Sequence, residues 1–173
     1  MKEQQKKYEL TDEFIEHWSG KKLYRIRALV AFGFVMAGQL GGFVESEKNL
    51  DQSLSGNAWV YGNAQVSGDA WVYGNAWVYG NAWVYGNAWV RSYAVISERK
   101  MIFGATNVGS ENGTLTVFNG KDGLIVTRGC FTGTVDNFLA KSAEVHDDKT
   151  KNEYKLLIEV AKSRILGVKD ERN

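Results

Sequence analysis

Three side chains in this sequence are of the types that most often carry acid–base or nucleophilic chemistry: His17, His146 and Cys130. A cysteine activated by a neighbouring imidazole is a nucleophile, so Cys130 in the segment TRGCFTG, with His146 as its base, is one hypothesis. The other interpretation is a small buried residue within a strand, since free cysteines are commonly buried. The two histidines suggest no third metal ligand, and phosphate-loop, dinucleotide and catalytic-serine motifs are absent. We therefore expect no catalytic residue, no metal site and no cofactor.

Aromatic side chains are the second group with chemical potential, and they recur at fixed spacing. Five of the six tryptophans fall between residues 59 and 89. Tryptophan and tyrosine are over-represented at interaction hot spots, so one hypothesis is a protein contact surface. The alternative is that rings on one face stack along the fold and support it. The candidate partner-binding residues are Trp59, Trp71, Trp77, Trp83, Trp89, Tyr61, Tyr73, Tyr79 and Tyr85.

The charge balance argues against a protein built around nucleic-acid phosphate. The 173 residues carry 21 Lys and Arg against 20 Asp and Glu, a formal net charge of +1, whereas phosphate binding depends on an excess of cations. Bases could stack on exposed tryptophans, but the electrostatic attraction that usually accompanies stacking is missing. Nucleic acid is therefore not expected as the sole partner. Five basic residues can be interpreted in two ways, as a basic patch or as part of a solvated surface of mixed charge: Arg25, Arg27, Arg91, Arg99 and Lys100.

Composition and hydropathy indicate an ordinary globular chain. Hydrophobic residues make up 44% and charged residues 24%, which argues against wholesale disorder. The single cysteine excludes an intrachain disulfide framework. The longest apolar stretch, residues 28–38, is roughly half of what a membrane span needs, and the polar residues 1–7 lack an apolar signal core. We expect a soluble cytoplasmic protein that does not enter the membrane.

The aromatic residues belong to a repeat of six residues that must position them. From Gly56 the chain runs GNAWVY, GNAQVS, GDAWVY, GNAWVY, GNAWVY, GNAWVR, SYAVIS, seven units over residues 56–97 without insertion. An internal period of this kind fixes the architecture before other signals are considered. Glycine accepts positive φ and Asn or Asp tolerates it, so each pair marks a corner. A short strand and a corner every six residues predict a coil, because the spacing is too tight for hairpins.

Alternation within each unit predicts which side chains face inward. Val follows Ala by two residues, and side chains two apart in a strand lie on the same side. We therefore expect the valines from Val60 to Ile96 to be buried and the intervening tryptophans to point outward. If three units make one coil, the outward residues fall on three faces that pair Trp59 with Trp77, Trp71 with Trp89, and Gln65 with Trp83.

These units resemble the left-handed parallel β-helix of hexapeptide-repeat proteins, in which three units form a triangular coil. The segment LYRIRALVAFGFVMAGQLGGFVESEKNL followed by the repeats resembles the YdcK-like branch of single-chain β-helix proteins. It also resembles phage and prophage products that open with YELTDE and pass into GNAxVxG repeats. The resemblance covers residues 8–97 and implies the handedness. Hexapeptide β-helices are best known as acyltransferases with a histidine in the coils, whereas His17 and His146 both lie outside the repeats.

Patterns outside the repeat predict two flanking modules. Residues 8–30 read as a β-hairpin turning at Ser19-Gly20-Lys21. The repeat register can be extended to Leu54 upstream and to Ile102, Thr106 and Val108 downstream. Strands at residues 114–118 and 124–131 precede two helices, one capped by Thr134 and one opened by a capping box of Thr150 and Glu153. We expect a mainly β fold: a β cap (1–43), a short left-handed β-helix (44–109) and a ββαα module (110–173).

The sequence favours a non-enzymatic binding protein of phage or prophage type. Its partner would be a protein, and the phage-like resemblance together with the missing catalytic constellation suggests a host defence component such as a CRISPR effector. Self-association into a homo-oligomer is also expected, because outward tryptophans expose much apolar surface. The alternatives are a minimal hexapeptide-repeat acyltransferase and a structural or oligomerising module of a virion.

Overall fold

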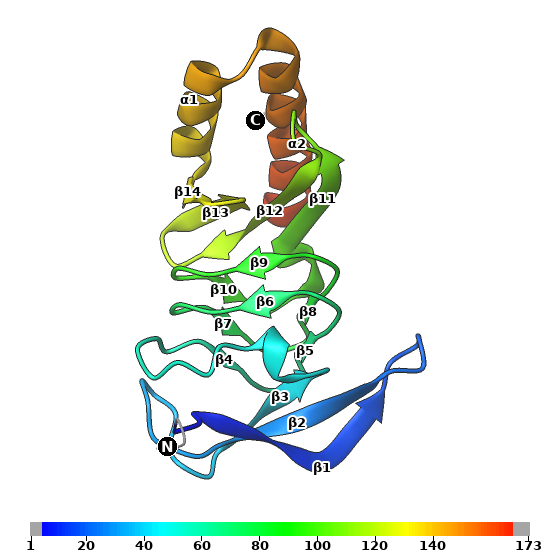
Figure 1. Cartoon of the computed structure of the whole chain (residues 1–173), viewed down its shortest axis with the longest axis vertical. Coiled ribbons are helices and arrows are strands. Elements are labelled where there is room, and N and C mark those ends of the chain that lie inside the picture. The colour runs from blue at the N-terminus through cyan, green and yellow to red at the C-terminus, as the bar shows by residue number, and fades with distance from the viewer. Residues whose placement is uncertain (1–4, 168–173) are drawn as a thin grey trace.

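The computed structural model describes residues 5–167 as a stack of three parts. An N-terminal β-hairpin lies under a solenoid of short strands, and a second sheet with two helices lies above it (Figure 1). The fold is mainly β, and its helix pair lies at the C-terminal end, as the sequence predicts.

The predicted N-terminal hairpin is present. Strand β1 (Tyr8–Glu16) pairs antiparallel with β2 (Lys22–Ala28), and β2 pairs with β3 (Leu40–Val44). The connecting turn includes Gly20 at a φ of +87°. Because β3 also pairs in parallel with the repeat strand β5, the hairpin and the solenoid share one sheet in the order β1-β2-β3-β5-β8.

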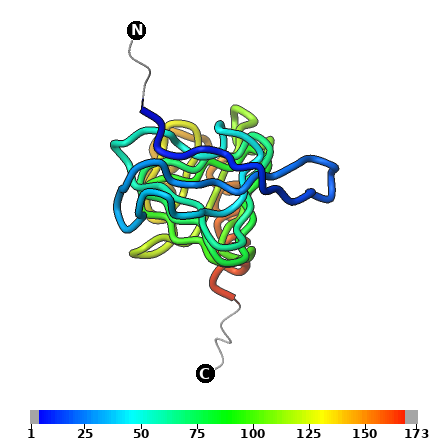
Figure 2. Tube along the Cα trace, turned by 90° about the horizontal axis from the view of Figure 1, so that it is seen from below, coloured from blue at the N-terminus to red at the C-terminus, as the bar shows by residue number. Residues whose placement is uncertain are grey.

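The repeat forms two-residue strands that pair in parallel at a spacing of 18 residues. Val60 lies beside Val78, Val66 beside Val84, and Val72 beside Val90. The strands therefore form three faces: a first face of β4, β7 and β10, a second of β5 and β8, and a third of β6 and β9. Figure 2 shows the stack from below, with the N-terminal hairpin in front of the coils. Their bounds are Trp59–Val60 (β4), Gln65–Val66 (β5), Trp71–Val72 (β6), Trp77–Val78 (β7), Trp83–Val84 (β8), Trp89–Val90 (β9) and Val95–Ile96 (β10).

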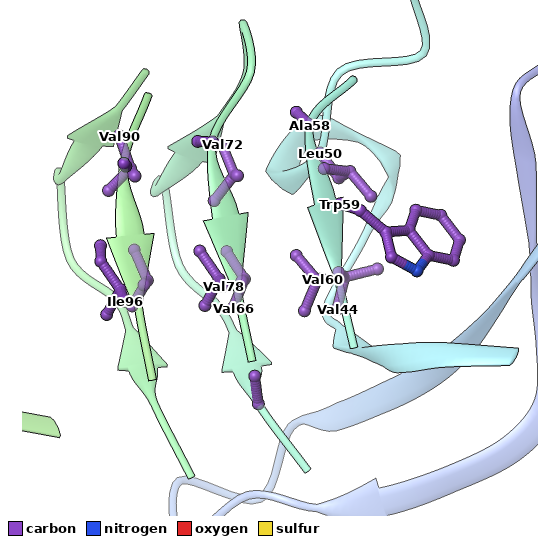
Figure 3. Packing of buried hydrophobic residues seen from close by; sticks show 14 of the residues in the cluster. Val44, Leu50, Ala58, Trp59, Val60, Val66, Val72, Val78, Val90 and Ile96 are labelled. Atoms are coloured by element: carbon purple, nitrogen blue, oxygen red, sulfur yellow. The ribbon is translucent and has the colours of Figure 1, made fainter. Parts of the chain in front are cut away.

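The side chains predicted to fill the core of the solenoid are the ones that the structure buries there. The valines from Val60 to Val90 and Ile96 are buried, as are the alanines two residues before each of them. Figure 3 shows these side chains stacked in columns inside the coil. All of these residues belong to one hydrophobic cluster, so the repeat buries a continuous apolar column.

Three different groups close the N-terminal end of the stack. Within the solenoid, the carbonyl of each inward alanine accepts a hydrogen bond from the coil before it, as Ala76 does from Trp59. The first coil has no coil before it. The Ala58 carbonyl accepts from Lys7 Nζ at 2.8 Å, that of Ala64 from the Phe43 amide at 3.0 Å, and that of Ala70 from Asn49 Nδ2 at 2.8 Å. The carbonyls at this end are thus hydrogen-bonded on all three faces. Buried carbonyls need such donors, because an unpaired polar group is costly away from water.

The register upstream of the repeat differs from the prediction. Val44 pairs with Val66 and Leu50 with Val72, a separation of 22 residues, four more than in the later coils. The additional residues form a loop after the 3₁₀ turn η1 (Glu47–Asn49). Leu54 lies in this loop and is exposed, so its predicted place in the core is wrong, and Leu50 fills that position instead.

The downstream register also ends earlier than predicted. After Ile96 the chain forms the 3₁₀ turn η2 (Arg99–Met101), and β11 (Ile102–Val108) pairs antiparallel with β12 (Gly113–Gly120) rather than adding to the coil. Two further strands, β13 (Gly123–Arg128) and β14 (Phe131–Thr134), complete a four-stranded sheet. The predicted single strand at residues 124–131 is therefore two strands joined by a turn.

Two helices cover this sheet. Helix α1 (Val135–Val145) is capped by Thr134, whose hydroxyl accepts from the Asn137 amide as predicted. Helix α2 (Asp148–Leu166) ends at Gly167 as predicted, but Asp147 rather than Thr150 caps its first turn. The Asp147 carboxylate accepts from the Thr150 amide at 2.8 Å, and this bond is the main reason why its pKa is lowered.

Candidate functional site

The outward tryptophans pair as predicted along the three faces, but they differ widely in exposure. Trp59 faces Trp77, Trp71 faces Trp89, and Gln65 faces Trp83. Trp59 is 1% exposed because Tyr8 and Phe32 of the N-terminal cap pack edge-on against its ring. The expected exposure of Trp59 is therefore wrong, and this side chain belongs to the core (Figure 3).

On the first face the rings support one another. The rings of Tyr61 and Tyr79 stack at 4.8 Å, with an angle of 5° between their planes. Trp77 is half-buried between Tyr61 and Phe34, both of which meet its ring edge-on. Burial raises the pKa of the Tyr61 phenol. This face fits the interpretation of aromatic residues as a structural ladder better than that of a contact surface.

The third face connects the solenoid to the C-terminal sheet. Trp71 stacks on Tyr73 at 3.8 Å and meets Trp89 edge-on. The Arg91 guanidinium lies over the Tyr73 ring and donates to the carbonyls of Gly129 and Phe131. Burial raises the pKa of Tyr73, although the nearby Arg91 charge opposes this effect. Trp89 keeps 40% of its surface exposed at the edge of this contact.

The second face carries the most accessible aromatic pair. Trp83 is half-buried, and the Arg99 guanidinium lies 3.4 Å from the centre of its ring. Tyr85, two residues later, is 65% exposed. At the equivalent positions one coil earlier the chain has Gln65 and Ser67, so the aromatic pair occurs only in the later coil of this face.

A groove of about 640 Å³ begins at this pair, and we call it the solenoid-end groove. It lies where the last coil meets β11 and α2, and its lining includes Trp83, Tyr85, Arg99, Phe103, Val160 and Arg164. A second hollow of about 370 Å³ continues from it toward Trp89 and shares Asn87 and Thr114 with it. The accessible aromatic residues of the second and third faces therefore border one concave surface. Neither the groove nor the part played by Val160 and Arg164 was evident from the sequence, because α2 is remote from the repeat in the chain.

Two of the three residues considered for catalysis, Cys130 and His146, are not part of this groove. Cys130 is exposed in the turn between β13 and β14, not buried in a strand as expected. His146 accompanies Ser142 instead, with 3.0 Å between Nδ1 and the hydroxyl oxygen, at the C-terminal end of α1. Ser142 is buried, and the hollow beside this pair measures only about 160 Å³. The contact fits the end of a helix, where the His146 amide also donates to the Ser142 carbonyl.

The N-terminal histidine has a local role. His17 Nδ1 lies 2.7 Å from the Ser19 hydroxyl within the hairpin turn, and its ring lies beside those of Trp18 and Trp83. Among residues 5–167, no three His, Cys, Asp or Glu side chains gather in a way that could hold a metal ion.

Comparison with known proteins bears on the repeat alone. The family model described as the YdcK beta solenoid repeat matches residues 64–80 and 76–98. None of the curated proteins matches the chain. Within the described part of the chain, no helix is both long enough and apolar enough to cross a membrane. The matches agree with the parallel pairing of the short strands and support a β-solenoid repeat in residues 64–98.

Proposed function

We propose that this chain is a non-enzymatic protein-binding module whose contact surface is the solenoid-end groove. The observation that carries the proposal is the position of Trp83 and Tyr85 at the rim of a concave surface of about 640 Å³. Large, rigid aromatic rings beside a pocket are typical of the centre of protein interfaces.

The chemistry of the groove supports binding rather than catalysis. Its lining combines apolar side chains such as Phe103 and Val160 with two arginines, and it holds no histidine, cysteine or carboxylate. General acid–base catalysis needs a group that can exchange a proton near neutral pH, whereas arginine stays protonated. The groove can position a partner, and its lining lacks the histidine, cysteine and carboxylate groups that most often transfer protons in active sites.

The test replaces the aromatic pair by the residues found one coil earlier on the same face. Trp83→Gln with Tyr85→Ser recreates the Gln65 and Ser67 unit, which the solenoid already accommodates. The wild-type chain and this variant are used as baits in host extract, and the retained proteins are compared by quantitative mass spectrometry. We expect one abundant protein to be retained by the wild type and at least about tenfold less by the variant.

The matched control is Trp77→Gln with Tyr79→Ser, which makes the same replacements on the first face, away from the groove. Circular dichroism and thermal melting of both variants check that the solenoid is intact. Equal retention by the two variants would show that the groove is not the contact surface. A wild-type chain that retains no protein and sediments as a monomer would overturn the binding function itself.

Three finer assignments belong to the same proposal. The phage-like resemblance supports a defence effector, such as a CRISPR complex, as the partner, and the mass-spectrometric identity tests this directly. Exposed side chains such as Phe34 and Met36 support self-association, which sedimentation velocity tests. The six-residue units support a left-handed coil, and an experimental electron-density map would reveal the hand.

A further inference from the structure

The parallel ladder of the solenoid stops before its last strands are covered. Backbone amides of each coil donate to carbonyls 17 residues later, as Trp59 does to Ala76 and Gln65 to Ala82. The last amide in this series is that of Asn81, which donates to Ser97. Among the described residues, the Trp83 and Tyr85 amides donate to no main-chain carbonyl of a following coil, and β8 pairs only with β5. Strand β8 is therefore an open edge.

The open edge results from the early departure of the chain from the coil. Continuing the series would place acceptors for β8 at residues 100 and 102. Residue 100 instead lies in η2, and Ile102 begins β11, where it pairs with Phe118. Strand β11 rises toward α2 instead of lying on β8 (Figure 1). The solenoid-end groove occupies the place of the missing strand, because Trp83, Tyr85 and Ile102 all line it.

The groove also has a definite charge. Arg99 and Arg164 are the only charged residues of its lining, and neither forms an ion pair within residues 5–167. Arg99 rests on the Trp83 ring, which leaves the edge of its guanidinium available as a donor. A guanidinium favours carboxylates, to which it can donate two parallel hydrogen bonds.

We propose that the groove binds an extended acidic segment of the partner protein, which adds to β8 as the next strand of the solenoid. This inference rests on the proposed function and specifies how the partner binds. The amides of Trp83 and Tyr85 point the same way and are two residues apart, so an extended chain with the same repeat can offer carbonyls to both. Carboxylates on alternate residues of that segment face Arg99 and Arg164.

The first measurement needs no partner. Amide hydrogen exchange of the free chain, followed by NMR, compares Trp83 and Tyr85 with Gln65 and Ser67, whose amides donate to Ala82 and Val84. We expect the Trp83 and Tyr85 amides to exchange at least about tenfold faster, since no main-chain bond protects them. Comparable protection would overturn the open edge. If a variant ending at Gly167 loses that protection, residues 168–173 are the occupant and the partner segment is not.

The second measurement uses a defined probe, the peptide acetyl-Glu-Val-Glu-Val-Glu-amide, and its analogue with Gln in place of Glu. We expect the acidic peptide to shift the Trp83 and Tyr85 amide resonances and to slow their exchange, and the Gln analogue to bind at least about tenfold more weakly. Shifts elsewhere only, or equal binding of both peptides, would contradict the proposal. A single-stranded oligonucleotide that shifts the same amides equally would indicate a general anion site and also contradict it.

Substitution of the two arginines tests how much their charge contributes to binding of the acidic peptide, separately from any effect on folding. Arg164→Gln leaves the stacking of Arg99 on Trp83 untouched and should weaken binding of the acidic peptide, and Arg99→Gln with Arg164→Gln should abolish it. The matched control is Lys162→Gln, which removes one exposed positive charge from α2 outside the groove. Equal weakening by the control would show that net charge alone is responsible. If the acidic peptide does not bind, but the variant Trp83→Gln with Tyr85→Ser still fails to retain the cellular partner, the binding function stands and strand addition is wrong.

Discussion

At the scale of single residues, Lys7 shows how a charge is used to end a solenoid. Its side chain is buried, lies over the Phe32 ring and donates to the carbonyls of Gly56 and Ala58. Burial disfavours the ammonium form and lowers the pKa of Lys7 to about 8, although the nearby Asp51 opposes this shift. The same residue therefore satisfies the open end of the first coil and makes stability sensitive to pH.

We predict that the free energy of unfolding rises with pH between about 8 and 10. In this window the unfolded chain keeps the Lys7 proton, whose ordinary pKa is 10.5, while the folded chain releases it. Stability then increases by up to about 1.4 kcal/mol per pH unit. Above pH 10 the sign changes, because burial raises the pKa of Tyr8 and the folded chain holds a proton that the unfolded chain loses. Urea unfolding at pH 7.5, 8.5 and 9.5 measures the slope.

The control for this prediction is Lys7→Met, which retains a long apolar side chain without a titratable group. We expect the variant to be less stable at pH 7.5, because it leaves two carbonyls without a donor, and to show a much smaller rise toward pH 9.5. An equal slope in both proteins would show that another group titrates in this window.

Exposure of individual side chains was the least predictable property at this scale. The alternation of Ala, Trp and Val correctly predicted which side of the strand Trp59 occupies. It did not predict that Tyr8 and Phe32 would cover the ring, because that contact depends on where the cap packs. Cys130 was misplaced for a similar reason: a turn at Gly129, with a φ of +56°, interrupts an apolar run that reads as one strand.

At the scale of elements, the corners of the solenoid explain why glycine recurs every six residues. Gly62, Gly68, Gly74, Gly80 and Gly86 all have positive φ. A side chain at Gly74 would lie 3.0 Å from the Ser92 amide nitrogen, the equivalent corner one coil later. Ser92 itself has a φ of +61° in the last coil. Backbone conformation thus favours glycine throughout this series, although Ser92 is accommodated where no coil follows, and the neighbouring coil disfavours a side chain wherever one follows.

Two alanine substitutions separate these requirements. Gly86→Ala places a methyl group at positive φ but in open space, and should cost about 1–2 kcal/mol. Gly80→Ala has the same backbone strain, and its methyl group would in addition lie 2.6 Å from the Ser97 carbonyl oxygen. We expect it to cost at least about 1 kcal/mol more, measured by urea unfolding at one pH. Equal losses would show that contact between coils is not what selects glycine.

The elements inside the repeat were predictable and those at its ends were not. Six-residue periodicity specifies the parallel pairing of β4 to β10, because every unit repeats the same pattern of residues. Ile102 and Val108 satisfy the same pattern, yet β11 leaves the coil because an antiparallel partner, β12, is available later in the chain. The solenoid-end groove arises from this departure, so the repeat alone could not reveal it.

At the scale of the whole molecule, the hydrophobic core runs from the hairpin through the solenoid into the C-terminal sheet. One cluster includes Tyr8, the stacked valines and Phe118 of β12. The Asn119 side chain donates to the Val95 carbonyl, and the Lys121 amide donates to that of Tyr93. A solenoid whose repeats contact only their neighbours needs closed ends to remain folded. The C-terminal sheet supplies one of these ends, just as Lys7 and Asn49 contribute to the other.

We therefore predict that a chain ending at Gly109 melts at a lower temperature than the full chain. Truncation removes Phe118 from the core, and loss of such a side chain alone costs about 3–5 kcal/mol. At roughly 2–4 °C per kcal/mol for a chain of this size, the midpoint should fall by at least about 6 °C, as measured by circular dichroism. Phe118→Ala in the full chain is the control, and should account for part of the loss while the other contacts of β12 remain. Equal midpoints for the full and truncated chains would mean that the solenoid folds independently and that the C-terminal sheet serves only to shape the groove.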